Sequence, residues 1–144
     1  MIFSDKQLSQ KIERTEARAN RAFVEARAKF SPEIGAEWIE VAGVYAMFDG
    51  IESPLTQTFG LGVFDEITDT EFDQIEAFFA KHDAPVLHEV SPLADASLIA
   101  LLNERDYEPI ELTSVMFQEI SVDKEITQPI NPNITTRIIE RGEE

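Results

Sequence analysis

Hydrophobic positions recur at two spacings along the chain, and these spacings separate the expected helices from the expected strands. Between Ser4 and Ser31 the apolar residues recur every three or four positions, which is typical of an amphipathic helix. Ser4 followed three residues later by Gln7 predicts a capped start, and Ser31-Pro32 predicts the end. The apolar stripe, which we expect to face the rest of the domain, consists of Leu8, Ile12, Ala19, Phe23, Ala26 and Phe30.

Shorter runs that are rich in β-branched and aromatic residues follow this helix, and they predict strands. Glu37–Val41 and Val44–Phe48 form two such runs, and a third covers Gln57–Phe64. The third run contains Gly60 and Gly62. Glycines inside a strand indicate a bulge or the close approach of another segment.

The second half of the chain continues with two further helices and more strands. Thr68 and Glu71 have the spacing of a capping box, and Ser91-Pro92 resembles the start of another helix. Val86–Val90 is predicted as a short buried strand, and Tyr107–Ile120 as two strands that meet at a kink. The residues expected to face the core are Phe72, Ile75, Phe78 and Phe79 in the second helix and Leu98, Ile99, Leu101 and Leu102 in the third.

The order of elements predicts an α/β fold, with a mixed, mostly antiparallel twisted sheet flanked by helices. A strand–helix–strand passage implies parallel pairing through a right-handed crossover, while the early strands are close enough for antiparallel pairing. We expect one domain over residues 1–122 and a polar linker over 123–133, where two prolines follow polar residues. Residues 134–144 are expected to begin with a further strand.

Charge changes this picture more than any other feature of the composition. The net charge is −16, yet residues 1–30 contain seven basic and four acidic residues, and the remainder contains five basic and 24 acidic ones. Lys81 is the only basic residue between Ser31 and Glu104. Phosphates need basic groups or backbone N–H donors, so nucleic acid is excluded as an expected partner. Two interpretations stay open: a solvated acidic surface, or attraction of a basic small molecule or peptide.

Several other classes of function are excluded by what the sequence lacks. There is no cysteine, so disulfides, thiolate catalysis and cysteine zinc sites are absent. No apolar run reaches the roughly 18 residues of a membrane span, and no secretory signal is visible, which favours the cytoplasm. The acidic stretch from Asp65 to Asp73 has no glycine of the kind that an EF-hand loop requires, so no metal site is expected.

The order of elements and several local segments together resemble the GNAT acyltransferase family. The segments are Ser53–Gln57 leading into Gly60–Val63, then His88–Leu93, then Leu101–Tyr107. The chain looks like the degenerate N-terminal half of a two-domain bacterial GNAT protein, and the resemblance covers residues 1–122. Residues 134–139 look like the opening strand of a second GNAT half. The resemblance implies a GNAT-like fold and a parent protein that is an N-acetyltransferase.

The same resemblance implies that this half does not carry out the chemistry itself. The family binds acetyl-coenzyme A through a loop of the form R/Q-x-x-G-x-G/A before a helix, whose N–H groups contact the diphosphate. The matching segment, Phe64–Glu71, has no glycine and contains four carboxylates. The family's general-acid tyrosine falls on Leu102, which has no proton to donate. We therefore expect no catalytic residue and no cofactor here, with acetyl-coenzyme A expected only for a catalytic second half.

A small polar cleft is the best remaining candidate for a binding site. If the Ser53–Gln57 loop folds over the neighbouring strand, the cleft would be lined by Thr56, Gln57, His88, Glu89 and Ser91. His88 and Glu89 are adjacent on a predicted strand and should point to opposite faces, so they are not expected to act as a pair. A well-packed turn is the alternative interpretation of this segment.

Three functions stay open. The first is a non-catalytic domain that packs against a catalytic GNAT half in cis or against a homodimer mate. The second is a stand-alone binding module for a small or basic ligand. The third is an active acetyl-coenzyme A-dependent N-acetyltransferase with an unconventional coenzyme site.

Overall fold

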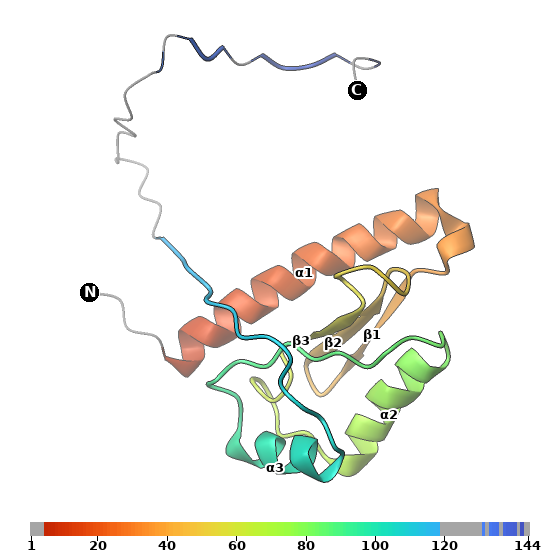
Figure 1. Ribbon diagram of the computed structural model, residues 1–144, viewed down its shortest axis with the longest axis vertical. Helices are drawn as coiled ribbons and strands as arrows, with labels where there is room; N and C mark the ends of the chain where they lie inside the picture. The colour runs from red at the N-terminus through yellow and green to blue at the C-terminus, as the bar shows by residue number, and fades with distance from the viewer. Residues whose placement is uncertain (1–4, 119–130, 132, 136, 141, 143–144) are drawn as a thin grey trace. The chain divides into compact units, whose positions relative to one another are not determined.

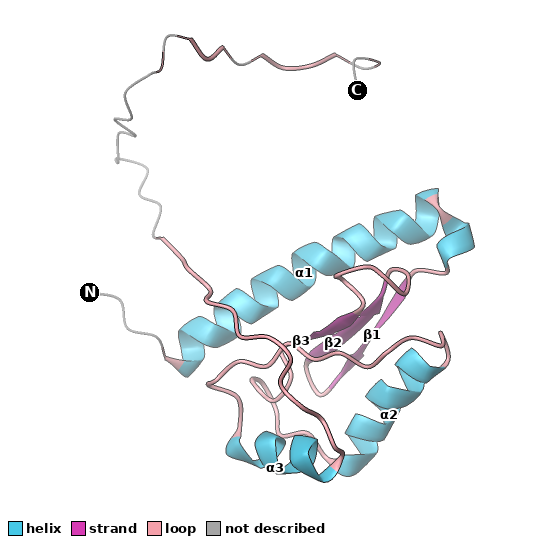
Figure 2. Cartoon of the chain, viewed as in Figure 1, coloured by secondary structure: helices cyan, strands magenta, loops and turns pink. Residues whose placement is uncertain are grey.

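The computed structural model describes residues 5–118, 131, 133–135, 137–140 and 142. The chain divides into two units, Met1–Pro109 and Ile110–Glu144. All helices and strands of the described residues lie in the first unit, where helices cover both faces of a sheet (Figures 1 and 2). The predicted mixed α/β class is confirmed at this level, with three α-helices and a three-stranded antiparallel sheet in the described chain.

The first two strands form a tight hairpin with the predicted bounds. β1 (Glu37–Val41) pairs antiparallel with β2 (Val44–Phe48), and Val41 lies opposite Val44. The two turn residues, Ala42 and Gly43, have φ angles of 47° and 76°. Positive φ at both turn positions gives a two-residue hairpin the twist that matches its strands.

The third strand is shorter than the sequence predicts. β3 (Gln57–Phe59) pairs with β2 and ends before Gly60, so the prediction of a strand through Phe64 is wrong. Gly60 and Gly62 adopt left-handed φ angles of 82° and 66°, which turn the chain out of the strand. Gly62 also allows close approach, since a Cβ there would lie 2.8 Å from Leu98 Cδ2.

The predicted strand Val86–Val90 is present only as a parallel bridge beside β3. Thr58 N–H donates to the Leu87 carbonyl, and Glu89 N–H donates to the Thr58 carbonyl. The bridge joins two segments that are separated in sequence by α2 (Asp69–Ala80), which gives the parallel pairing expected from a strand–helix–strand passage.

The first helix, α1 (Lys6–Phe30), begins one residue later than predicted. Asp5 is its cap, because the extended Asp5 backbone lets its carboxylate accept the Leu8 N–H. Ser4 lies outside the described residues. The helix ends at Phe30, and Ser31 follows as its C-cap, as expected.

The face that α1 turns toward the sheet is not the predicted one. The buried residues are Glu13, Ala17 and Val24, whereas Phe23 is 51% exposed and Phe30 is 77% exposed. Two arginines that lie between the buried positions of α1 contact aromatic rings on the side of the helix that faces the sheet. The Arg14 guanidinium lies 3.9 Å from the Phe64 ring centre, and that of Arg21 lies 4.7 Å from the Trp38 ring centre. Arginine stems and cation–π contacts therefore take the place of the apolar stripe.

The other face of the sheet is covered by α2 and α3 (Ala96–Glu104). The capping box of α2 is confirmed, and so are its four buried residues Phe72, Ile75, Phe78 and Phe79. The start of α3 lies at Asp95 rather than at Ser91-Pro92, because the Asp95 carboxylate accepts the Ser97 N–H while residues 91–94 form a turn. Leu98 is buried as predicted, but Ile99 is 53% exposed and faces outward.

The predicted strands after Tyr107 do not form in the described residues. Residues 107–118 contain no helix or strand, and Ile110, Leu112 and Met116 are more than 80% exposed. A strand needs a neighbouring strand to pair with, and no strand pairing is present for the described residues 107–118. The described part of 134–140 is likewise without strand structure. The predicted domain end at residue 122 and most of the predicted linker 123–133 lie outside the described residues.

Candidate functional site

The segment in which the resemblance would place a coenzyme is closed by its own side chains. Glu71 Oε2 accepts hydrogen bonds from the N–H and the hydroxyl of Thr68, at 2.9 and 2.7 Å. The Thr68 hydroxyl in turn accepts the Glu71 N–H. These bonds from Thr68 lower the pKa of the Glu71 carboxyl. A carboxylate and a hydroxyl thus already occupy two of the backbone donors, the N–H groups of Thr68 and Glu71, that a diphosphate would use at this helix start.

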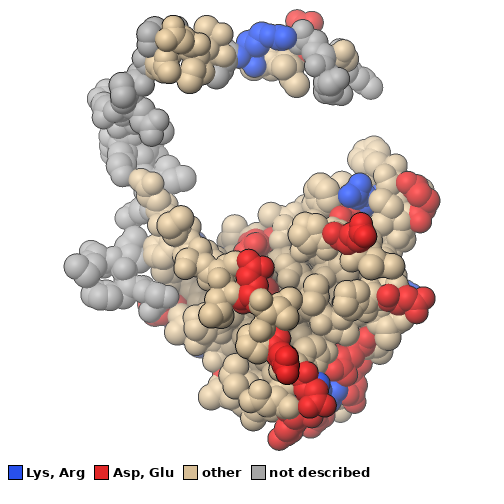
Figure 3. Space-filling model, in the orientation of Figure 1, with Lys and Arg blue, Asp and Glu red and all other residues tan. Residues whose placement is uncertain are grey.

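The basic side chain near this helix start already forms ion pairs. Arg105, which follows α3, contacts three carboxylates of α2: Asp69 at 3.0 Å, Asp73 at 2.7 Å and Glu76 at 2.8 Å. Figure 3 shows Asp and Glu side chains gathered at the end of the first unit where α2 and α3 meet. Arg105 therefore partly neutralises an acidic surface and is not a free ligand for a phosphate.

The residues of the predicted cleft do not come together in one site. Thr56 is buried inside its turn, where its hydroxyl accepts the Asp49 N–H and donates to the Gly50 carbonyl. Gln57 begins β3 and pairs with Met47. These two residues support the interpretation of a well-packed turn, because their contacts serve the local backbone.

His88 and Glu89 point to opposite sides of the sheet, as their adjacency predicts. His88 Nδ1 lies 2.9 Å from the Thr58 hydroxyl, and the imidazole packs against Phe72 and Tyr107 on the side of α2. Its Nε2 is buried and has no hydrogen-bond partner. Burial lowers the pKa of His88 to about 4, so the ring is neutral at pH 7.

Glu89 and Ser91 instead lie beside α1. The Ser91 hydroxyl is 2.9 Å from the Ser9 hydroxyl, which joins the 86–91 segment to the first turns of α1. Burial and the nearby Glu16 carboxylate raise the pKa of Glu89. These two residues are the part of the predicted cleft that faces other polar side chains.

Glu13 is the functional candidate that the sequence interpretation missed. It is 9% exposed, and its Oε2 accepts the Gly60 N–H at 3.2 Å. Burial, and then the carboxylates of Glu89 and Glu16, raise the pKa of Glu13 to about 7. We name Glu13, Glu16 and Glu89 the acidic cluster. The sequence contained one signal for the burial of Glu13. Its spacing from Ala17 and Val24 places all three residues on the same face of a helix.

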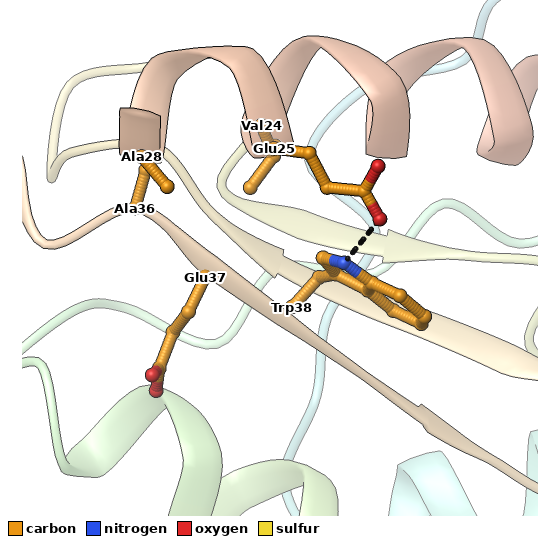
Figure 4. A pocket seen from close by; sticks show the side chains of 6 residues that line it. All are labelled: Val24, Glu25, Ala28, Ala36, Glu37 and Trp38. Atoms are coloured by element: carbon orange, nitrogen blue, oxygen red, sulfur yellow. Dashed lines mark hydrogen bonds between the residues drawn. The ribbon is translucent and has the colours of Figure 1, made fainter. Parts of the chain in front are cut away.

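A separate shallow groove lies where the second half of α1 passes β1. It has a volume of about 280 Å³ and is lined by Val24, Glu25, Ala28, Ala36, Glu37 and Trp38. Figure 4 shows the Trp38 indole below the helix, with its N–H donating to Glu25 Oε1 at 3.2 Å. Glu37 points away toward α2, where it contacts Lys81 and His82. The groove therefore offers an apolar surface with little polar capacity left to orient a ligand.

Two absences apply to the part of the chain that the structure describes. Within it, His, Asp and Glu side chains form no group of three or more that could hold a metal ion. None of its helices combines the length and apolar character that a membrane span requires.

Comparison with known proteins gives no assignment. A scan against protein-family models, a search of curated proteins and a search of solved structures each found no match.

Proposed function

We propose that this chain is a non-catalytic GNAT-like domain of an N-acetyltransferase protein, which packs against a catalytic GNAT half or a homodimer mate. The order α1, three antiparallel strands, α2, a parallel bridge and α3 supports the proposal. The local segments that resemble the family lie on these elements: Gly60–Val63 follows β3, and His88 forms the bridge.

The observation that carries the non-catalytic part is the start of α2. A coenzyme diphosphate needs free N–H groups and positive charge at this position, but Thr68 and Glu71 satisfy each other there. Arg105, the basic side chain that contacts this helix, is surrounded by Asp69, Asp73 and Glu76. Leu102 packs against the core and provides no acid where the family uses a tyrosine. In this proposal the chain supports folding and assembly of the enzyme.

Calorimetric titration with acetyl-coenzyme A tests the proposal. We expect no heat of binding and no change in melting temperature, because the diphosphate would displace the capping box against four carboxylates. A matched variant, Glu71→Gln, retains the size of the side chain and removes one charge; we expect it not to bind either. Saturable binding by the native chain would overturn the proposal in favour of an active enzyme with an unconventional coenzyme site. A crystal with the diphosphate seated at residues 65–71 would do the same.

A second candidate function, the binding of a small basic ligand, is favoured by the acidic cluster. Burial raises the pKa values of Glu13 and Glu89, and so does repulsion, from Glu89 and Glu16 on Glu13 and from Glu16 on Glu89; a cation beside the acidic cluster would offset that repulsion. Spermidine is a suitable probe. If this function is correct, spermidine raises the melting temperature of the native chain but not that of Glu13→Gln, at constant ionic strength. An equal rise in both proteins would indicate general screening of the charge of −16.

A further inference from the structure

The outward face of α1 carries an apolar stripe that no described part of the first unit covers. We name it the outer stripe, and it consists of Ile12, Ala19, Ala22, Phe23, Ala26 and Phe30. Only Ile12 is partly buried, and the two phenylalanine rings are 51% and 77% exposed. Single exposed apolar residues are normal on a protein surface, whereas a continuous stripe along one helix face indicates an interaction surface.

Charges along the two sides of the outer stripe are self-complementary. With 3.6 residues per turn, Arg18 and Glu25 lie on one side of the stripe, and Glu16 and Arg27 lie on the other. Each side thus carries one pair of opposite charges, and in residue number both pairs are centred at the same point, between Arg21 and Ala22. In an antiparallel pair of identical helices, the same side of each helix faces its counterpart. A twofold axis at this midpoint therefore puts Arg18 opposite Glu25 of the partner subunit, and Glu16 opposite Arg27 of the partner subunit.

The apolar residues fit the same axis. Phe23 comes to lie near Ala19 of the partner subunit, and Phe30 near Ile12 of the partner subunit, with midpoints one residue or less from the charged pairs. A large ring beside a small or aliphatic residue permits close helix packing. The charged groups are accessible, since the Glu25 and Arg27 side chains are 49% and 39% exposed although each already has a partner.

We propose that α1 is a dimerisation helix whose outer stripe packs antiparallel against that of a second copy, about a twofold axis beside Ala22. Two copies that met through the strongly acidic remainder of the chain would repel each other more than two copies of α1, because residues 1–30 contain seven basic and four acidic residues and are only weakly basic. The same patch serves both subunits, so the contact closes as a dimer. The inference rests on the homodimer part of the proposed function, and the coenzyme titration above can fail or succeed independently of it.

A chain without cysteine allows the register to be tested by single substitutions. Ala22→Cys places a thiol beside the axis, where its counterpart is offset by about 1.5 Å along the helix. Ala26→Cys is the matched control on the same stripe, with its counterpart about 14 Å away along the helix. A disulfide requires Cα atoms within about 7 Å. We therefore expect mild oxidation to cross-link Ala22→Cys into covalent dimers and to leave Ala26→Cys as single chains; equal cross-linking of both variants would overturn the antiparallel register.

Light scattering of the native chain tests the dimer itself. We expect a mass that rises to twice that of one chain, and at least about a tenfold weaker association for Phe23→Asp, with unchanged helix content. Arg18→Glu should also weaken the dimer, and Arg18→Glu combined with Glu25→Arg should restore it. A native chain that stays monomeric at every concentration reached would overturn the proposal. So would a Phe23→Asp variant that dimerises as well as the native chain.

Discussion

The two faces of the sheet are covered in different ways, although the strands present apolar or aromatic side chains on both faces. Toward α2 and α3, the sheet presents Val44, Ala46 and Phe48, and the helices add large apolar side chains. Toward α1, it presents Tyr45, Met47 and Phe59, but the helix adds only Ala17 and Val24 to this buried cluster. Most of the other contacts of α1 are polar. They are made by arginines and by Glu13, together with Ser9, Gln10 and Glu25.

This difference shows that a helix can be held by polar side chains when the surface below it is aromatic. The rings of Tyr45, Trp38 and Phe64 each lie within about 5 Å of an arginine guanidinium. Such contacts are individually weaker than the burial of a phenylalanine. We therefore expect the face under α2 to dominate stability, and the face under α1 to be adjustable by charge and pH.

The largest expected effect is the loss of a phenylalanine under α2. Phe79→Ala removes a fully buried ring and should lower the free energy of unfolding by about 3–5 kcal/mol, measured by urea denaturation. Phe23→Ala on α1 is the matched control. Its ring is 51% exposed, so the change should stay within about 0.5 kcal/mol at a concentration at which the chain is monomeric. Equal losses in the two variants would contradict the burial of Phe79 under α2 and the exposure of Phe23 on the outward face of α1.

The second effect is pH-dependent and belongs to the face under α1. The pKa of Glu13 is raised to about 7, so the folded chain binds a proton that the unfolded chain releases between pH 4.5 and 7. The stability that Glu13 contributes is therefore fully present below pH 4.5 and is lost as the pH rises to 7. Glu13→Gln retains an acceptor for the Gly60 N–H and removes the titration. At pH 8 it should be more stable than the native chain by about 2–3 kcal/mol, and at pH 4.5 nearly equal.

The free energies of unfolding of the variant and the native chain must be compared at each pH, because the titration of His88 changes stability in the opposite direction. Its pKa is lowered to about 4, so its contribution to stability is lost as the pH falls from 6.5 to 4. The two effects partly cancel in the native chain. In Glu13→Gln the contribution of Glu13 is absent, while those of His88, Glu89 and the carboxyls with lowered pKa values remain, so the change with pH of the difference between the two proteins reports on Glu13. A difference between the two proteins that does not change with pH would show that the Glu13 carboxyl is not buried in solution.

A third effect compares two glycines that leave β3 toward opposite faces. Gly62→Ala would place its Cβ 2.8 Å from a methyl group of Leu98, which is buried under α3, and Gly60→Ala would place it 2.8 Å from the edge of the Phe64 ring. Both positions have left-handed φ angles, so the backbone strain is shared. Because Phe64 is only partly buried and can move, Gly62→Ala should cost about 1–3 kcal/mol and more than Gly60→Ala. Thermal melting of the two variants measures the difference.

Much of the fold was predictable from local patterns, although the local signals for a helix start at Ser91-Pro92 and for a strand through Phe64 were wrong. The hairpin of β1 and β2, the capping box of α2 and the inward face of α2 all follow from residues within one turn or one strand. The inward face of α1 was not predictable by the same reasoning, because Phe23 and Phe30 form the more apolar stripe. Which stripe packs inward depends on the aromatic rings of the opposing strands, and that information lies in a different segment of the sequence.

In the candidate site, too, local features were predictable and contacts between distant segments were not. The opposite orientation of His88 and Glu89 follows from strand geometry, and the lack of a coenzyme loop follows from the absence of glycine between Phe64 and Glu71. The proximity of Glu13 to Glu89 depends on how α1 crosses the sheet, which no spacing in the sequence states. Thr56 was assigned to a cleft because it is polar, although its hydroxyl completes the turn that it belongs to.

The smallest expected effect concerns the cation–π contact between Arg21 and Trp38. Arg21→Met retains much of the apolar stem and removes the guanidinium that lies 4.7 Å from the indole centre. Because the Arg21 side chain is 37% exposed, the loss should be only about 0.5–1 kcal/mol. Trp38 is the only tryptophan, so its emission reports directly on this contact and should change with the variant even where the stability change is small. Arg21→Lys should restore part of the stability, since an ammonium retains the charge without the planar stacking. If Arg21→Met alters neither emission nor stability, the contact of Arg21 with Trp38 does not help to hold α1 on the aromatic face, which is then left to Arg14 and to the buried Ala17 and Val24.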